Sequence, residues 1–364
     1  MQNAPGIMRM YWNVINDEMA RHSVKEDEVR IALRRVKDAY LPMRERSLKT
    51  HCSDRFNALA DCYAYLHLYA PLHTSMAYDI MSWILSEIPG WFRTFLSSHE
   101  LLKICSLGGG PGADVIGVVT ALQDEFGYIN TFANIVDIFS AWSRTFQAVL
   151  HKMTSGYYGD KGRCLSSQFF KWSYITSDLL CERDQDVNAA ITDAGLVIMS
   201  KFISAVASQN ASKMIKDIFK RMKPGAILLY IDNDGGEHHK VVSTIASECH
   251  LVPLLRPLQH HQYRNEGLRI NRFGTWSCCE TKITVQIMEK RCEFPPVWNH
   301  FLFPQAETNN RDLHLLGRKV RNVDQHSYTF DRRIRQRRNK YKRRRRNRKP
   351  HFKNFLVLRS KKGC

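Results

Sequence analysis

Apolar and aromatic residues recur at spacings of three and four over much of the first 98 residues of the chain. The segments Arg55–Tyr69 and Met76–Ile88 show this spacing, which predicts helices with one buried face. Pro71 and Pro89 are interpreted as breakers between helical segments. The segment Glu26–Tyr40 is more charged, with acidic residues first and basic residues later, as is typical of a solvated surface helix. We therefore predict a helical N-terminal region.

The pattern changes between residues 101 and 289, where short apolar runs alternate with amphipathic stretches. The apolar run Leu101–Leu107 precedes the amphipathic stretch Asp114–Phe126, and similar pairs follow up to the run Ala226–Ile231. Alternating strands and helices predict a parallel sheet that is covered on both faces. The last run, Thr281–Lys290, alternates like a more exposed strand and is predicted to be an antiparallel member of the sheet.

Charge changes this picture only near the carboxyl end. The 364 residues carry 54 Lys+Arg and 35 Asp+Glu, a formal net charge of +19. Residues 332–364 contain 17 Lys+Arg and no acidic residue, which leaves 37 basic and 35 acidic residues in the rest of the chain. The near-neutral body excludes a protein that is basic throughout, such as a histone-like or ribosomal wrapping protein.

The basic block Arg332–Lys349 has 13 Lys+Arg among its 18 residues, and we predict that the tail 332–364 is disordered. Such a block binds RNA or DNA phosphates with strong salt dependence, and it is also typical of a nuclear import signal. A solvated tail without a specific partner is the alternative. The preceding residues 293–331 show no clear period and are predicted to be irregular.

The ten cysteines form no Cys-x-x-Cys pair, which favours reduced core thiols in an intracellular protein. A zinc site formed by His51, Cys52 and Cys62 is the alternative, but its spacing matches no common ligand pattern, and we expect no metal. Apolar stretches such as Val115–Leu122 are shorter than the roughly 18 residues of a membrane span. No secretory signal is visible, so the expected location is intracellular, in the nucleus if the tail directs import and otherwise in the cytoplasm.

A glycine-rich turn, LGGGPG, joins the first predicted strand to the helix that follows. The strand ends at Leu107, and Gly108, Gly110 and Gly112 allow a tight turn and a close approach of a ligand to the backbone. The free N–H groups at the helix start favour a negative or strongly polar ligand group. Because Gly108, Gly110 and Ala113 also satisfy the dinucleotide pattern G-x-G-x-x-A, an NAD or FAD site is an alternative.

A carboxylate follows near the end of the second predicted strand. Asp137 lies 25 residues after Gly112, near the separation expected for a group that accepts hydrogen bonds from both hydroxyls of a ribose. A helix-capping role is the alternative interpretation of Asp137.

From this point the order of motifs resembles that of class I S-adenosylmethionine-dependent methyltransferases. The motifs LGGGPG, VDIFSAW, SDLL, DAGLVIMSKFISAV and RMKPGAILLYID occur in this order within about Leu101–Glu289. The resemblance implies an α/β fold with a doubly wound, mostly parallel seven-stranded sheet, the Rossmann-like methyltransferase fold, with an N-terminal helical extension. The implied segments are a helical extension (1–98), a cofactor-binding domain (99–292), an irregular segment (293–331) and a basic tail (332–364).

The resemblance also implies S-adenosylmethionine as cofactor and a set of contacts to it. The three glycines of the turn would line its methionine part, Asp137 would hold the ribose hydroxyls and Ile138 would pack on the adenine. Asp178 would meet the adenine amino group, although a turn-forming role is nearly as well supported. Met199 and Ser200 would border the transferred methyl. The full set of implied contacts is Leu107, Gly108, Gly110, Gly112, Asp114, Asp137, Ile138, Asp178, Leu179, Met199 and Ser200.

One position departs from the family. An acidic residue often stands two positions before the first glycine and contacts the methionine ammonium, but here that residue is Ser106. Asp114, just after the turn, is expected to supply the charge instead. An exposed first-turn residue that favours the helix N-terminus is the alternative interpretation of Asp114.

The methyl acceptor stays unassigned. The fourth strand ends in VIMSKF, which lacks the Asn/Asp-Pro-Pro-aromatic motif that resembles amino methylation of bases. Asp232, Asp234 and Lys201 are weak candidates for acceptor contacts or a base, with a polar turn and a surface lysine as the alternatives. In similar enzymes an N-terminal extension often covers the acceptor, and the stripe of Tyr and His in the segment Cys62–Thr74 suits that role, although helical core packing explains it as well.

Two functions from different classes remain. The first is a methyltransferase that moves the methyl group by in-line displacement. The second is a catalytically degenerate methyltransferase fold that binds nucleic acid through its basic tail. A nicotinamide-dependent oxidoreductase is a more distant alternative.

Overall fold

The computed structural model describes residues 4–39, 59–156, 160–181, 185–206, 211–235 and 237–292. All of them belong to one unit, Met1–Glu293. The predicted irregular segment 293–331, the basic tail 332–364 and the pair His51 and Cys52 lie outside the described residues. The predictions made for them therefore stay predictions.

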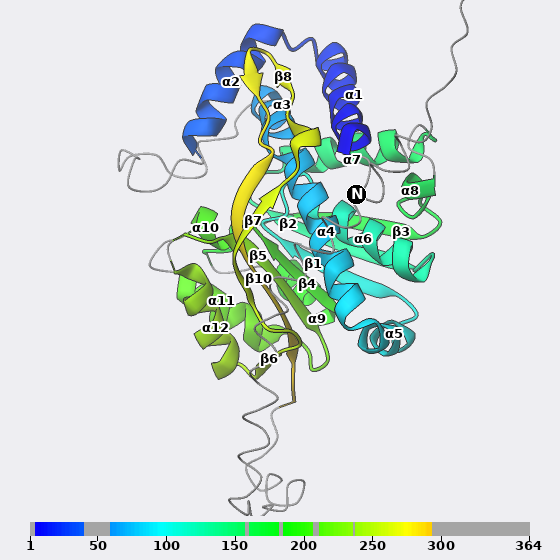
Figure 1. Ribbon diagram of the computed structural model, residues 1–364, viewed down its shortest axis with the longest axis vertical. Coiled ribbons are helices and arrows are strands. Elements are labelled where there is room, and N and C mark those ends of the chain that lie inside the picture. The colour runs from blue at the N-terminus through cyan, green and yellow to red at the C-terminus, as the bar shows by residue number, and fades with distance from the viewer. Residues whose placement is uncertain are drawn as a thin grey trace, which may run out of the picture. The chain divides into compact units, whose positions relative to one another are not determined.

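The sheet has the order β3-β2-β1-β4-β5-β10-β6, with β7 paired to β10. Its first five strands are parallel, and β10 runs antiparallel to β5, as the alternation of its sequence predicts. Figure 1 shows the strands in this order. The strands are β1 (Leu102–Leu107), β2 (Thr131–Asp137), β3 (Phe170–Thr176), β4 (Leu196–Ser200), β5 (Ile227–Asn233), β6 (Leu251–Pro253), β7 (Leu258–Arg264) and β10 (Glu280–Lys290).

The described residues form a sheet of eight strands, whereas seven were predicted. The reason is the length of β10, which has 11 residues. Its final residues, Met288–Lys290, pair with β6, and its first residues, from Glu280, pair with β7 after an irregularity between Ile283 and Val285. The long strand β10 thus pairs with both β6 and β7 along one edge.

Two apolar clusters lie on the two faces of the sheet, because successive strand residues point to opposite sides. Ile104, Ile198 and Leu229 belong to the cluster that includes α4, α6 and α7. Leu107 and Leu228 belong to the cluster that includes α9, α11 and α12. The fold is therefore doubly wound. The helices between the strands are α6 (Ala113–Phe126), α7 (Ala141–Thr154), α8 (Asp160–Arg163), α9 (Gln185–Asp193), α10 (Ile203–Val206), α11 (Ala211–Arg221) and α12 (His238–Glu248).

In the described part of the chain, five helices precede the sheet, as the N-terminal pattern predicts. They are α1 (Ala4–His22), α2 (Glu26–Ala39), α3 (Leu59–Leu68), α4 (Ala70–Glu87) and α5 (Pro89–Ser97). The two prolines lie at the boundaries between helices, as predicted, because Pro71 and Pro89 occupy the first turns of α4 and α5. A proline is tolerated there because the first N–H groups of a helix have no intrahelical partner.

Helix α4 packs directly on α6 along one face of the sheet. A Cβ added to Gly117 of α6 would lie 2.5 Å from the carbonyl oxygen of Thr74 and 2.8 Å from the backbone nitrogen of Tyr78, both on α4. Backbone therefore meets backbone at this crossing. Through this contact the N-terminal helices form part of the layer that covers the sheet.

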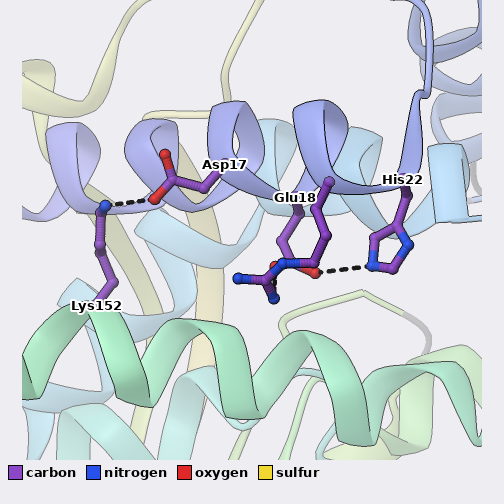
Figure 2. Close-up of polar contacts among 5 residues, drawn as sticks. Asp17, Glu18, His22 and Lys152 are labelled. Atoms are coloured by element: carbon purple, nitrogen blue, oxygen red, sulfur yellow. Dashed lines mark hydrogen bonds and ion pairs between the residues drawn. The ribbon is translucent and has the colours of Figure 1, made fainter.

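Helix α1 lies along α7, and an ion pair joins the two helices (Figure 2). Lys152 of α7 reaches Asp17 of α1. The Glu18 side chain is only 4% exposed and is paired with Arg21 at 2.7 Å and with His22 at 3.5 Å. A nearly buried carboxylate needs such partners, because an unpaired buried charge is costly.

A small hairpin, β8 (Asn271–Arg272) and β9 (Thr275–Trp276), packs against these N-terminal helices. The Arg272 guanidinium lies 5.3 Å from the Trp12 ring of α1, and His67 of α3 makes a 2.9 Å hydrogen bond with the carbonyl of Thr275. After β7, a short turn of 3-10 helix, Glu266–Leu268, leads to the hairpin. No helix in the described part of the chain is both long and apolar enough to cross a membrane.

Candidate functional site

The glycine turn follows β1 at the carboxyl edge of the sheet. Gly108, Gly110 and Gly112 have φ values of +65°, +51° and +68°, in the left-handed region that favours glycine. A Cβ on Gly108 would lie 2.2 Å from the ring of Phe202, and one on Gly112 would lie 2.5 Å from the ring of Phe146. Gly110 is buried, yet a Cβ there would meet no heavy atom within 4 Å. The free room at the turn is therefore at Gly110.

Asp137, at the end of β2, contacts Gly110. One carboxylate oxygen accepts a 2.9 Å hydrogen bond from the N–H of Gly110, and the other accepts a 3.1 Å bond from the N–H of Phe139. Burial raises the pKa of Asp137 to about 6, against the lowering effect of these two bonds. Helix α7 has Ser140 as its N-cap, so the helix-capping interpretation of Asp137 is wrong.

The structure brings Ser106 and Asp114 together. The Ser106 hydroxyl donates a 2.7 Å hydrogen bond to the Asp114 carboxylate, which also accepts a 2.9 Å bond from the N–H of Val115. Asp114 is only 4% exposed, which excludes the interpretation as an exposed first-turn residue. Burial raises its pKa to about 6, and the nearby charge of Asp137 contributes to the rise. The Asp114 carboxylate thus lies beside Ser106. In the family that the sequence resembles, an acidic residue often stands at the position of Ser106.

Asp178 forms a turn after β3. Its carboxylate accepts a 2.9 Å hydrogen bond from the N–H of Leu180 and a 3.4 Å bond from the thiol of Cys181. These contacts are those of the turn-forming interpretation. The neighbouring Leu179 is buried in the apolar cluster of α9, α11 and α12, whereas Ile138, after β2, is half-buried.

The two residues at the end of β4 point to opposite faces of the sheet. Met199 is fully buried in the cluster of α9, α11 and α12. Ser200 points to the α4 side, and its hydroxyl is buried without a hydrogen-bond partner among the described residues. A buried hydroxyl without a partner is unfavourable, so Ser200 is a natural contact for a ligand.

The carboxylates of Asp232 and Asp234 are both engaged within the protein. Asp232 is fully buried and accepts hydrogen bonds from the backbone N–H and the hydroxyl of Ser204, at 3.0 Å and 2.5 Å. It thereby ties the end of β5 to α10. Burial raises the pKa of Asp234, but hydrogen bonds from His260, Lys282 and Thr284 outweigh that effect and hold the pKa well below its usual range. These contacts support a structural role for both residues.

Lys201 differs from the two aspartates. Its φ is +56°, a strained conformation for a lysine. Its ammonium donates to the Asn233 side chain at 2.5 Å and to the Thr281 hydroxyl at 2.8 Å. Burial lowers the pKa of Lys201 to about 8, although Asp232 opposes the shift. The Lys201 side chain is half-buried, and its ammonium is held between β5 and β10.

His73, a member of the stripe of Tyr and His in Cys62–Thr74, lies at the start of α4. The four-residue step from Tyr65 to Tyr69 to His73 puts the three on one helical face. Tyr65 and His73 share a 3.0 Å hydrogen bond, and the rings of Tyr69 and His73 stack with centroids 6.0 Å apart. Burial, with a smaller contribution from the charge of Lys201, lowers the pKa of His73 to about 3.

The remaining histidine of the stripe has a structural role. His67 is fully buried, and its ring contacts Phe273 edge-on in addition to its bond to Thr275. The eight described cysteines are all free, and Cys62, Cys105, Cys164 and Cys249 are buried. Within the described ranges, no three His, Cys, Asp or Glu side chains are grouped so that they could hold a metal ion.

No protein-family model matches the sequence, and no curated protein matches it either. Many solved structures match in fold. A SAM-dependent methyltransferase of Methanosarcina mazei is 14% identical with a TM-score of 0.35, over 54% of this chain and 95% of that protein.

Two further structures are of the same kind. An O-methyltransferase family protein of Burkholderia thailandensis is 14% identical with a TM-score of 0.39, over 65% of this chain and 62% of that protein. Magnesium protoporphyrin IX methyltransferase of Synechocystis, solved with bound SAH, is 11% identical with a TM-score of 0.34, over 60% of this chain and 83% of that protein. In the order of its strands, the antiparallel β10 and the glycine turn after β1, the chain has the Rossmann-like methyltransferase fold.

Proposed function

We propose that the chain is an S-adenosylmethionine-dependent methyltransferase. The observation that carries the proposal is the contact between Asp137 and Gly110. It brings together a carboxylate and a buried glycine with free room beside it, at the carboxyl ends of β1 and β2. In open α/β sheets ligands bind beyond these strand ends, where the strand order reverses. β2 and β4 lie on the two sides of β1, so the reversal is at β1.

The residues present suit this cofactor. Asp137 would accept the ribose hydroxyls in place of the Gly110 N–H, and Asp114 would meet the methionine ammonium in place of the missing acidic residue at Ser106. Ser200, whose hydroxyl lacks a partner among the described residues, supplies a polar contact on the β4 side. When bound, S-adenosylmethionine supplies an electrophilic methyl group, and the chain has the task of positioning it.

Isothermal titration of the full chain with S-adenosylhomocysteine tests the proposal. We expect saturable binding of one molecule per chain, and no binding of NADH under the same conditions. NADH is the matched control because the glycine turn also satisfies a dinucleotide pattern. Binding of NADH without binding of S-adenosylhomocysteine would overturn the proposal in favour of an oxidoreductase.

The affinity for S-adenosylhomocysteine is expected to fall as the pH drops from about 7 to about 5. Asp114 and Asp137 have pKa values raised to about 6, so both become protonated over this range. A protonated carboxyl group cannot pair with an ammonium and is a poorer acceptor for hydroxyls, so binding must expel the protons. Titrations at several pH values measure this loss, which is limited to about tenfold per pH unit for each group. The Asp114→Asn variant should show a weaker pH dependence, and an affinity that stays constant in the wild type would contradict the assignment.

A further inference from the structure

The chain turns sharply between β4 and the short helix α10. Lys201 has a φ of +56°, and its N–H donates a 2.7 Å hydrogen bond to the carbonyl of Ile231 on β5. The N–H groups of Ala205 and Val206 both donate to the carbonyl of Phe202, so the helical turn begins at that residue. A left-handed residue other than glycine is strained, and such a conformation persists only where the surrounding contacts hold it in place.

Two side chains at the end of β5 supply these contacts. Asp232 accepts hydrogen bonds from the backbone N–H and the hydroxyl of Ser204, at 3.0 Å and 2.5 Å. The amide of the neighbouring Asn233 donates to the same hydroxyl at 3.0 Å, and its oxygen accepts a 2.5 Å bond from the Lys201 ammonium. The first and the last residue of the turn, Lys201 and Ser204, are therefore both bonded to β5.

The Asp232 carboxylate is fully buried, which is unusual for a group of this charge. Its hydrogen bonds come from the N–H and the hydroxyl of Ser204 and from the N–H of Asn233 at 2.6 Å, and these three donors are all uncharged. Burial of a carboxylate costs free energy that neutral donors recover only in part. A buried polar group of this kind suits a role in fixing one conformation of the turn that it contacts.

The turn carries Phe202, whose ring lies directly against the glycine turn that follows β1. Phe202 is 6% exposed and belongs to the apolar cluster of α9, α11 and α12. A Cβ added to Gly108 would have three ring atoms of Phe202 within 3.0 Å. The N–H of Gly108 also donates a 2.8 Å hydrogen bond to the carbonyl of Val136 on β2. The position of Gly108 is thus fixed by the Phe202 ring and by β2.

We propose that Asp232 and Ser204 are positioning residues that act through Phe202 on Gly108 and so set the affinity for the amino-acid part of S-adenosylmethionine. The inference rests on the proposed function, in which the glycine turn lines that part of the cofactor. Asp232 and Ser204 are not catalytic residues, because the carboxylate and the hydroxyl are bonded to each other.

The adenosine part of the cofactor depends on a different contact. In the proposed complex Asp137 holds the ribose, and its hydrogen bond to Gly110 does not involve the turn after β4. A displaced Phe202 ring should therefore weaken the binding of the amino-acid part and leave the adenosine part unaffected. S-Adenosylhomocysteine and 5′-methylthioadenosine separate the two parts, because the second ligand has the adenosine and the thioether but lacks the amino acid.

The test compares these two ligands by isothermal titration of the full chain. Ser204→Ala removes a hydrogen bond to a charged acceptor, so we expect the affinity for S-adenosylhomocysteine to fall about tenfold. The affinity for 5′-methylthioadenosine should stay within about twofold of the wild-type value. Ser204→Thr, which keeps the hydroxyl, should restore the wild-type affinity. A general loosening of the fold would instead weaken both ligands alike.

Two further variants show whether the effect passes through the ring. Asp232→Asn keeps the size of the side chain but weakens its hydrogen bonds, so it should reproduce the selective loss. In a Phe202→Leu chain, adding Ser204→Ala should cost less than about threefold, because the ring through which Ser204 acts is gone. Ser97→Ala is the matched control, because this exposed hydroxyl of α5 donates at 2.8 Å to the carbonyl of Thr94, and the variant should bind both ligands as the wild type does.

The outcomes separate this inference from the proposed function. If the wild type binds S-adenosylhomocysteine and Ser204→Ala binds it equally well, or loses affinity for both ligands to the same extent, the positioning role is overturned while the proposed function stands. A full tenfold loss from Ser204→Ala in the Phe202→Leu chain would overturn the path through the ring. If the wild type does not bind S-adenosylhomocysteine, the proposed function fails and the inference fails with it.

Discussion

Replacing Asp137 with alanine is expected to weaken the binding of S-adenosylhomocysteine by about 100-fold. The carboxylate stands at the end of β2, and its oxygens accept hydrogen bonds from the N–H of Gly110 in the glycine turn and from the N–H of Phe139 after β2. In the proposed complex these oxygens accept two hydroxyl hydrogen bonds, each of which is worth about 1.5 kcal/mol or more when the acceptor is charged. The loss is measured by isothermal titration at about pH 8, where Asp137 is ionised.

Two further variants show whether the effect belongs to the charge at this position. Asp137→Asn keeps the size of the side chain and one acceptor oxygen, so it should lose less affinity than the alanine variant. Asp193→Ala removes a surface carboxylate that is paired with Lys103 at 2.8 Å, and it should bind as the wild type does. An Asp137→Ala chain that is folded and binds S-adenosylhomocysteine with unchanged affinity would contradict both the assignment of the residue and the proposed site.

Replacing Gly117 with valine is expected to lower the free energy of unfolding by about 3 kcal/mol. The added Cβ alone would lie 2.5 Å from the carbonyl oxygen of Thr74, and this atom belongs to the backbone of α4, which cannot rotate away as a side chain can. The two helices must therefore move apart, which opens gaps in the apolar layer on one face of the sheet. Chemical denaturation measures the loss, and the thermal midpoint should fall by roughly 10 °C.

Gly90 supplies the control for this substitution. It lies in the first turn of α5, and a Cβ there would meet no atom within 4 Å, so Gly90→Ala should leave the stability unchanged or raise it slightly. Because Thr74 is next to His73, separation of α4 from α6 also displaces His73. If Gly117→Val has the stability of the wild type, the close approach of α4 to α6 is not as described.

The strands and their order along the chain were predictable because the signal is local. A run such as Leu101–Leu107 is apolar over its whole length, and β1 spans Leu102–Leu107. The alternation in Thr281–Lys290 is likewise a property of consecutive residues, and it correctly predicts β10 as antiparallel. β7 was not predicted, because its sequence LQHHQYR has little apolar character and its pairing depends on the free edge of β10.

Local sequence was also sufficient to identify the glycine turn and Asp137 as candidates for a cofactor site, because a tight turn after a strand needs glycine wherever it occurs. It was not sufficient to predict the burial and the hydrogen-bond partners of the other candidate residues. Asp114 is buried against Ser106, whereas Asp232 is occupied by Ser204. The first contact joins the two ends of the glycine turn, and the second joins β5 to α10, which follows β4.

The ionisation of Lys201 and His73 shows most clearly what local sequence could not predict. The two residues are far apart in the chain, and their types and spacing predict nothing in common. Burial lowers the pKa of both side chains, and that burial depends on elements that pack together only in the folded chain. The periodicity and turn chemistry of the sequence thus predict the fold and the side of the sheet on which a cofactor belongs. The ionisation and hydrogen-bond partners of the side chains there depend on which groups are withdrawn from water together, and that is a property of the folded chain.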